Sequence, residues 1–328
     1  MAAVTADAPE SLFEQYRPLL LGLGYRLLGS MWDAEDVVQE AYLRWTRTDR
    51  DQVREPRAFL VTVVSRLALD QLRSARATRE AYVGPWLPEP ADTGELGPLD
   101  TAELRDTLSY ATLYLMEQLT PPERAAFVLR EAFEMPYDAI AAIVGGTAAN
   151  CRQLHHRATT RLAAARGDRF RPTGEDHARL LTRFLDAARG GDLDALTGML
   201  SEDVTAWNDG GGRARAALNP IAGRDRVIAF VLGLARRFPI DTARLTESNG
   251  QPALWLTVDG KDQLVLLDIE DGVIHGVFAV LNPDKLTRLA ARERDRDREH
   301  DGAGQHDRGA GQHDRDQEHD RDQQRESS

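Results

Sequence analysis

The sequence contains little cysteine, little lysine and no long apolar run. Its one cysteine, Cys151, excludes an internal disulfide and fits a reducing compartment. No apolar stretch approaches the roughly 18 residues that a membrane span needs. The N-terminal segment MAAVTADAPE lacks the basic and apolar parts of a signal peptide. We therefore expect a soluble, cytoplasmic protein that folds without disulfides.

Positive charge is also scarce overall, because the 328 residues carry a net charge of −12. This acidity argues against indiscriminate binding to DNA. Arginines nevertheless concentrate in two segments. The segment Arg54–Arg79 contains six arginines and two acidic residues. The segment Thr147–Phe170 contains five arginines and one acidic residue. Charges more than about 8–10 Å away are screened at cellular salt, so local charge decides contacts with phosphates. The pattern predicts two DNA-contacting segments in an acidic chain.

The first part of the chain is expected to form three helices. Apolar residues recur at helical spacing from Leu12 to Leu28, and Gly29-Ser30 interrupts them. Asp33 is expected to cap the second helix. Its predicted buried positions are Val37, Ala41, and Leu43 or Trp45.

A polar loop, Thr46–Glu55, separates the second helix from the third, which Pro56 opens at a tolerated first-turn position. The apolar positions predicted to be buried in the third helix are Phe59, Val63, Leu67 and Leu72. This assignment leaves three basic side chains outside: Arg66, Arg73 and Arg76.

A helix-turn-helix is predicted further along the chain. Thr120-Pro121-Pro122-Glu123 has the pattern of a helix start. Tyr137–Ile143 is expected to form a short helix, Val144–Thr147 the turn, and Ala148–Ala165 the second helix. Cys151 has the spacing of a packed thiol on the apolar face of that second helix. An arginine-bearing helix of this kind fits the major groove of DNA.

The remaining chain changes character. A Pro- and Gly-rich linker contains the apolar segment YVGPWLPEP, Tyr82–Pro90. Helices are expected at Asp176–Arg189, Asp192–Leu200 and Arg224–Arg237. Strands separated by Asn-Gly and Asp-Gly turns follow, which predicts an α+β domain with an antiparallel sheet. Residues 291–328 are charged and repetitive and are expected to be disordered. The four histidines of this tail are not expected to hold a metal.

The order of these segments resembles an extracytoplasmic-function (ECF) sigma factor of the sigma-70 family. DAEDVVQEAYLRW, Asp33–Trp45, resembles the part of region 2 that binds the β′ clamp helices of RNA polymerase. PRAFLVTVVSRLALDQLRS, from Pro56, resembles the part that melts and reads the −10 element. Leu104–Arg166 resembles region 4, which reads the −35 element and faces the β flap. The resemblance implies two all-α sigma domains.

Site residues are assigned by this resemblance, position by position. The residues implied for polymerase binding are Asp33, Asp36, Gln39 and Glu40. Those implied for the −10 element are Thr48, Asp49, Arg50, Arg66, Arg73 and Arg76, the first three in the loop that would hold a flipped base. Those implied for the −35 element are Arg152, Gln153, His156 and Arg157.

The C-terminal part resembles the SnoaL-like branch of the NTF2-like fold, and three motifs match the SigJ-like subgroup of these factors. They are WLPEP, DGGGR and NPDKL. In that subgroup the extension contacts the sigma domains and sets their activity. The residues implied for these regulatory contacts are Trp86, Leu87, Pro88, Asp209, Gly210, Gly211, Gly212, Arg213, Asn282, Pro283, Asp284, Lys285 and Leu286.

The expected domains are therefore region 2 (1–80), a linker (81–102), region 4 (103–168), a SnoaL-like cone domain (174–290) and a tail (291–328). We expect a sigma factor that needs no cofactor or metal and is not an enzyme. Its partners would be core RNA polymerase and promoter DNA. One alternative is a ligand-responsive DNA-binding regulator that works without polymerase. Another is an NTF2-like enzyme with a DNA-binding appendage.

A small-molecule ligand of the C-terminal domain is left open by the sequence. NTF2-like cones often enclose one, and a carboxylate in an apolar pocket can act as a general base. Asp209 in its DGGGR turn is nevertheless expected to hold backbone N–H groups. The residues expected to line such a cavity are Asp209, His275, Trp207 and Trp255.

Overall fold

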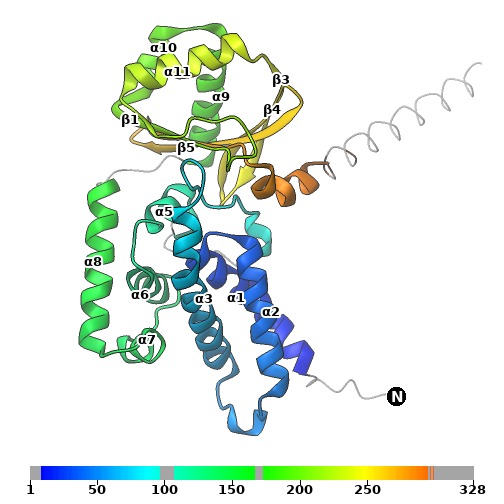
Figure 1. The fold of residues 1–328 in the computed structure, drawn as a ribbon, viewed down its shortest axis with the longest axis vertical. Helices are drawn as coiled ribbons and strands as arrows, with labels where there is room; N and C mark the ends of the chain where they lie inside the picture. The colour runs from blue at the N-terminus through cyan, green and yellow to red at the C-terminus, as the bar shows by residue number, and fades with distance from the viewer. Residues whose placement is uncertain (1–8, 97–106, 167–172, 295, 297, 299–328) are drawn as a thin grey trace, which may run out of the picture. The chain divides into compact units, whose positions relative to one another are not determined.

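The computed structural model describes residues 9–96, 107–166, 173–294, 296 and 298. It forms two compact units, Met1–Leu286 and Thr287–Ser328, which are treated separately. Within the described residues, no helix is long and apolar enough to cross a membrane. Figure 1 shows the order of the elements along the chain.

Three helices and a short 3-10 turn make up the N-terminal part: α1 (Pro9–Leu28), α2 (Met31–Arg47), η1 (Arg50–Gln52) and α3 (Pro56–Glu80). Gly29 ends α1 with a φ of +69°, a conformation that glycine adopts without strain. Ser30, and not Asp33 as predicted, is the N-cap of α2, and its side chain accepts the Asp33 N–H. A hydroxyl directly before the first helical residue caps better than a carboxylate that lies inside the first turn.

The buried face of α3 differs from the prediction by one position. Leu60, Val64 and Ala68 are fully buried, whereas Phe59 and Val63 are only half-buried. Phe59, Val63 and Leu67 also pack against the helical core, but from its edge. The apolar spacing alone selected these edge positions. Of the four residues predicted to be buried, only Leu72 is buried, and Leu67 is half-buried like Phe59 and Val63.

The second helical part contains η2 (Thr93–Glu95), α5 (Tyr110–Met116), α6 (Pro121–Glu131), α7 (Tyr137–Val144) and α8 (Ala148–Arg166). Glu123 accepts the Thr120 N–H at 3.0 Å, which confirms the predicted capping box at the start of α6. Gly145 and Gly146 have positive φ angles and form the turn between α7 and α8. The predicted apolar face of α8 is confirmed, because it buries Cys151, Leu154, Ala158 and Leu162.

The C-terminal domain combines three helices with six strands. The helices are α9 (Gly174–Gly190), α10 (Leu193–Met199) and α11 (Arg224–Arg237). The strands are β1 (Leu200–Asp209), β2 (Ile221–Ala222), β3 (Ile240–Ser248), β4 (Gln251–Val258), β5 (Lys261–Glu270) and β6 (Val273–Val280). They form one sheet in the order β2-β1-β6-β5-β4-β3. The predicted α+β class is confirmed.

Two details of this sheet differ from the prediction. Strands β1 and β2 were missed, and β1 pairs with β6 in parallel, so the sheet is mixed and not antiparallel throughout. The three predicted hairpins are correct. In each turn the Asn or Asp has a φ of 51–57° and the glycine after it also has a positive φ, as such hairpin turns require.

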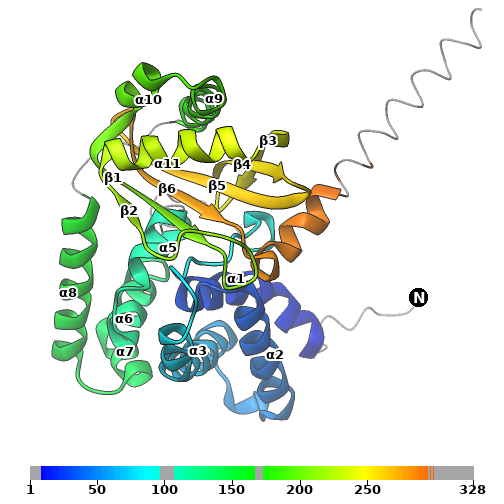
Figure 2. The same cartoon turned by 45° about the horizontal axis from the view of Figure 1, so that its top comes forward.

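The helices of this domain cover one face of the sheet (Figure 2). Leu181 and Phe184 of α9 and Val227 of α11 share a core with Val204 of β1 and Leu254 of β4. Side chains alternate along a strand, so residues such as Trp207 and Asp209 point to the other face. One face of the sheet is therefore buried by its own helices, and the other face carries Trp207 and Asp209.

Residues 287–294 belong to the second unit and are helical. The predicted disordered tail is therefore wrong for residues 291–294. Apart from residues 296 and 298, the rest of that tail lies outside the described residues.

Candidate functional site

The exposed face of α2 carries the first group of predicted site residues. Asp36, Gln39 and Glu40 are exposed, and Asp33 is half-buried. Asp33 accepts a hydrogen bond from Gln71 Nε2 at 2.8 Å. Burial raises the pKa of the Asp33 carboxyl above its ordinary value. Asp36, Gln39 and Glu40 thus face solvent, although Glu40 accepts a hydrogen bond from Arg44 Nε at 2.9 Å, and Asp33 is partly engaged with α3.

Two apolar side chains extend this face and were missed from the sequence. Trp32 is 52% exposed and Leu43 is 39% exposed. Their spacing of four and seven residues from Asp36 places them on the same side of the helix. Leu43 was considered for the core, but Trp45 occupies that position. The face of α2 is therefore an acidic strip with an apolar residue at each end.

A surface cavity of about 400 Å³ lies at the loop between α2 and α3. It is lined by Thr48, Asp49, Gln52, Val53, Arg54, Glu55 and Phe59. The sequence predicted Thr48 and Asp49 here but placed Phe59 in the core. The Phe59 ring packs at 6.0 Å against that of Trp45 and is the aromatic wall of the cavity. The side chain of Arg50 lies outside the described residues.

The predicted arginines of α3 have different surroundings. Arg66 is exposed and donates to the Ala142 carbonyl oxygen at 2.9 Å. Arg73 is exposed and lies 3.2 Å from Asp70. The side chain of Arg76 lies outside the described residues. Arg66 therefore has an intramolecular partner where a free backbone-tracking cation was predicted.

Helix α8 presents its four predicted residues, Arg152, Gln153, His156 and Arg157, to solvent. Arg157 lies 3.4 Å from Glu123, which also binds Arg161 at 2.9 Å. The guanidinium of Arg152 lies over the Tyr137 ring, 5.2 Å from its centre. The helix thus exposes a polar surface while three of its arginines, Arg152, Arg157 and Arg161, contact neighbouring helices.

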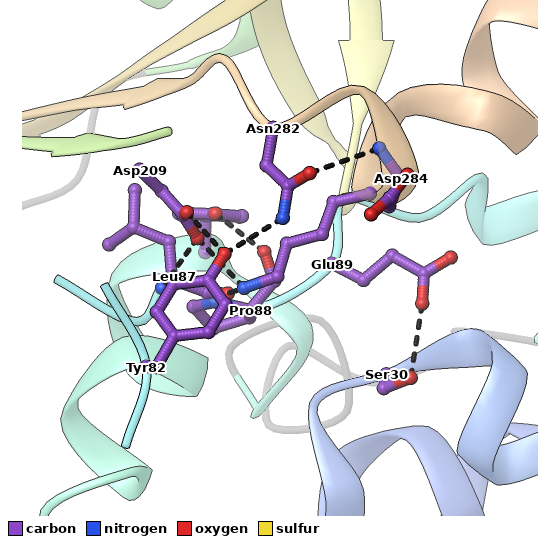
Figure 3. Close-up of polar contacts among 10 residues, drawn as sticks. Ser30, Tyr82, Leu87, Pro88, Glu89, Asp209, Asn282 and Asp284 are labelled. Carbon is purple, nitrogen blue, oxygen red and sulfur yellow. Dashed lines mark hydrogen bonds and ion pairs between the residues drawn. The ribbon is translucent and has the colours of Figure 1, made fainter. Parts of the chain in front are cut away.

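The three motifs of the linker and the C-terminal domain meet at Asp209 (Figure 3). Asp209 is fully buried at the end of β1. Its carboxylate accepts hydrogen bonds from Tyr82 Oη at 2.6 Å and from the Leu87 N–H at 3.0 Å. The ammonium group of Lys285 lies 2.7 Å away. Asp209 therefore holds a backbone N–H, as predicted from the sequence, and is also one half of a buried ion pair.

Asn282 and Lys285 complete this cluster from the NPDKL side. Asn282 Nδ2 donates to Tyr82 Oη at 2.8 Å. Lys285 donates to the Leu87 carbonyl oxygen. Burial lowers the pKa of the Lys285 ammonium, and the nearby Asp209 charge opposes that shift. At the rim, Arg213 and Asp284 are exposed and lie 3.2 Å apart. Leu286 is buried.

Neighbouring atoms lie so close to the backbone of the DGGGR turn that Gly210 and Gly211 leave no room for a side chain. Gly211 has a φ of +55°, and a Cβ atom there would collide with the Asn282 amide and the Tyr82 hydroxyl. A Cβ on Gly210 would collide with the Ala214 carbonyl oxygen. Gly212 also has a positive φ, of +71°. Gly210 and Gly211 therefore have no room for a side chain, whereas a Cβ on Gly212 would lie at an ordinary contact distance of 3.5 Å from Val83.

Trp86 lies between two cations. Lys285 Nζ is 3.5 Å from the centre of its ring, and the Arg79 guanidinium is 5.1 Å from it. Arg79 in turn forms an ion pair with Glu117, which also binds Arg124 at 2.6 Å. A single chain of contacts thus runs from the C-terminal domain through the linker to α3 and the loop before α6.

The linker also reaches the start of α2 through Glu89, which was not predicted as a site residue. Its Oε2 accepts the Met31 N–H at 2.7 Å and the Ser30 hydroxyl at 3.2 Å (Figure 3). The Glu89 side chain is buried. Pro88 contributes a carbonyl oxygen to Tyr110 at 2.7 Å. An acidic residue between two prolines in an apolar segment was the sequence signal for this contact.

The residues predicted to line a cavity have different contacts. Trp207 stacks on Phe278 at 4.8 Å and contacts Tyr114 of α5 at 4.9 Å. His275 lies 3.7 Å from Asp203. Trp207 and Asp209 share the sheet face opposite the helices, because they lie two residues apart on β1. Trp255 lies under the Arg244 guanidinium, with the ring centre 5.9 Å away. A cavity lined by these residues stays a prediction.

Two parts of the chain match known families. Residues 12–78 match sigma-70 region 2, and residues 111–162 match sigma-70 region 4. The chain is similar to the ECF RNA polymerase sigma factor SigJ of Mycobacterium tuberculosis, with 37% identity over 301 residues, 87% of this chain and 95% of that protein.

Two further similarities cover most of the chain. The probable ECF RNA polymerase sigma factor SigI of the same species is 34% identical over 292 residues, 87% of this chain and 97% of that protein. The crystal structure of SigJ from Mycobacterium tuberculosis has a TM-score of 0.68 and 34% identity, and covers 85% of this chain and 98% of that one. The similarity therefore extends beyond the helical regions into the C-terminal domain.

Proposed function

Because the chain belongs to the ECF sigma factors of the sigma-70 family, we propose that it directs core RNA polymerase to promoters with −35 and −10 elements under the control of its own C-terminal domain. The family makes it an RNA polymerase sigma factor and not an enzyme. What we propose is which residues bind polymerase and the two promoter elements, and that the C-terminal domain controls this activity.

Core polymerase binds the exposed face of α2. Asp36, Gln39 and Glu40 supply acidic and amide groups for a polar partner. Trp32 and Leu43 add apolar area at the two ends of this strip. Tryptophan is enriched among the few residues that carry most of the binding energy of a protein–protein interface, so Trp32 is a candidate anchor.

The −10 element is melted and read at α3 and the loop before it. The cavity at Thr48 and Asp49 is walled by the Phe59 ring and has polar groups on its rim. A base that leaves the stack needs an aromatic or apolar wall and donors or acceptors for its edge. Phe59 therefore joins Thr48, Asp49 and Arg50 as a candidate for holding that base. Arg66, Arg73 and Arg76 supply positive charge along the strand.

The −35 element is read by α8 of region 4. Arg152, Gln153, His156 and Arg157 are exposed on one side of this helix, and the other side is buried against α6 and α7. Arginine and glutamine side chains are well suited to the base edges of the major groove. The same arginines also contact phosphates, which fix the register of the helix on DNA.

Control by the C-terminal domain is supported above all by the buried carboxylate of Asp209. It joins the linker residues Tyr82 and Leu87 to Lys285 of the NPDKL motif. The position of the linker sets how regions 2 and 4 are spaced, and their spacing must match that of the two promoter elements. A domain that holds the linker can therefore control promoter recognition.

The control is tested with substitutions in the full chain. Asp209→Asn keeps the shape of the side chain but removes the charge that pairs with Lys285. Asp225→Asn, at an exposed position in the first turn of α11, is the matched control. In vitro transcription with core polymerase should give transcript levels that change by roughly fivefold or more for Asp209→Asn, in either direction, and that stay unchanged for Asp225→Asn. Equal transcription by both variants and the wild type would contradict regulation by the C-terminal domain.

A small-molecule ligand of the C-terminal domain is a separate hypothesis. Within the described residues, the buried His177 Nε2 and Asn208 Nδ2 atoms have no hydrogen-bond partner. These two polar atoms mark where a polar ligand would be sought, in place of the residues first expected to line a cavity. Thermal unfolding of the wild type and of Asn208→Leu in the presence of a metabolite library tests it, because a ligand held there would stabilise only the wild type.

A further inference from the structure

The Tyr137 ring contacts two guanidinium groups from different helices. The guanidinium Cζ of Arg130, near the end of α6, lies 5.1 Å from the centre of the ring. The Cζ of Arg152, in the first turns of α8, lies 5.2 Å from the same point. Both distances fall within the range of a cation–π contact. Tyr137 itself is the first residue of α7 and is half-buried.

The ring is held in place by its other contacts. The Tyr137 hydroxyl lies 3.3 Å from His155 Nδ1, and the imidazole packs edge-on against the Tyr137 ring at 6.0 Å. His155 Nε2 lies 2.7 Å from the Glu131 carboxylate. The Phe127 ring stacks on the imidazole, with the ring centres 6.3 Å apart. Residues from α6 and α8 therefore fix the orientation of the tyrosine.

Arg152 is the one member of the exposed polar set of α8 that rests on this ring. An exposed arginine samples many rotamers, and ordering it on binding opposes affinity. A guanidinium that stacks on an aromatic face keeps its N–H groups in the plane, where they can still donate. The contact with Tyr137 thus orders Arg152 before DNA arrives and leaves its donors available.

We propose that Tyr137 is a positioning residue for −35 recognition, which holds the Arg152 guanidinium ready to donate both of its forked N–H groups to one guanine. This inference rests on the proposed role of α8 at the −35 element. Guanine is the expected base because its O6 and N7 acceptors match a bidentate arginine. Arg130 shares the ring but donates to the Met135 carbonyl oxygen at 3.1 Å, so its role is to hold the turn before α7.

The test measures base preference, which a general loss of stability does not change selectively. Full-length protein and core polymerase transcribe a set of promoters in which each −35 base pair is replaced in turn. The variants are Tyr137→Leu, which removes the ring, Tyr137→Phe, which keeps it, Arg152→Ala, and the double variant. We expect Arg152→Ala to abolish discrimination at one G·C pair. Tyr137→Leu should reduce discrimination at that same pair by about 3- to 10-fold.

The remaining variants separate the possible outcomes. Tyr137→Phe should keep the wild-type profile, and the double variant should match Arg152→Ala. A changed profile for Arg152→Ala with a wild-type profile for Tyr137→Leu overturns the positioning role alone. A wild-type profile for Arg152→Ala overturns the −35 assignment of Arg152 and the positioning role with it. A loss by Tyr137→Leu that is equal at all base pairs also overturns it.

A second measurement does not depend on the folding of Tyr137→Leu. In NMR spectra of the wild type, the Arg152 δ-protons should be shifted upfield by the ring current of Tyr137. Their resonances are identified by their absence from Arg152→Ala, and Tyr137→Phe should keep the shift. Arg152 resonances at the position of a free arginine in the wild type would overturn the stacking on which the proposal depends.

Discussion

Lys285 Nζ lies 3.5 Å from the centre of the Trp86 ring and 2.7 Å from the Asp209 carboxylate. One ammonium group thus joins the linker to the end of β1. Both charged groups are buried, since the side chain of Asp209 is 0% exposed and that of Lys285 is 9% exposed. Removing one member of such a pair leaves the other charge uncompensated, whereas removing both is far less harmful.

Lys285→Met is therefore expected to destabilise the protein by about 3–5 kcal/mol, because it leaves the Asp209 carboxylate buried and unpaired. The double variant Lys285→Met, Asp209→Asn should recover a large part of that loss. Urea unfolding of the full chain, followed by tryptophan fluorescence, measures both. If the double variant is less stable than Lys285→Met alone, the two groups do not act as a pair.

Gly211→Ala tests the close approach inside DGGGR. The new methyl group would collide with Asn282 and Tyr82, and the left-handed conformation adds strain of roughly 1–2 kcal/mol. Gly191→Ala is the matched control, since Gly191 has a similar φ of +73° with no atom within 4 Å of the added Cβ. Thermal unfolding should show a clearly larger loss for Gly211→Ala. Equal losses would mean that backbone strain alone decides the effect.

The apolar ends of the α2 face give a prediction for polymerase binding. Trp32→Ser is expected to weaken the binding of core polymerase by up to about tenfold, because tryptophan is enriched among the residues that carry interface affinity. Leu43→Ser should weaken binding less, because leucine is under-represented among those residues. Leu193→Ser is the matched control, since Leu193 is 55% exposed at the start of α10. Fluorescence anisotropy with labelled protein measures the affinity. Unchanged affinity in both α2 variants would confine the contact to the polar strip.

Local patterns in the sequence were sufficient for the elements that follow local rules. The Thr120–Glu123 capping box, the glycine turn before α8 and the three hairpins each depend on a few adjacent residues. The burial of Cys151 and Leu154 also followed from helical spacing. The family assignment predicted from motif order is confirmed by relatives that share 37% and 34% identity with most of the chain.

Features that depend on distant partners were missed. Strand β1 ends at Asp209 and is stabilised by parallel pairing with β6, about 70 residues later, which no local pattern reveals. Phe59 was assigned to the core because its spacing fits, yet its ring forms the wall of a surface cavity. Glu89 lies beside α2 only because the linker folds back on region 2.

His177 provides a test of the C-terminal domain by pH. It is buried on α9, and loss of hydration lowers its pKa from the ordinary 6.5 to about 4. Between these two values the unfolded chain binds a proton that the folded chain does not. Stability from this group is therefore complete above about pH 6.5 and falls as the pH decreases toward 4, by roughly 3 kcal/mol at most.

His177→Phe removes this titration, so the variant should lose less stability than the wild type when the pH is lowered from 7 to 4.5. Other groups titrate in the same range, but they are shared by both proteins and cancel in the comparison. His156→Phe, at an exposed position on α8, should behave like the wild type. Urea unfolding at the two pH values measures each difference. If His177→Phe and His156→Phe lose the same stability as the wild type, His177 is protonated as easily in the folded chain as in the unfolded one, and its burial does not disfavour the charged form.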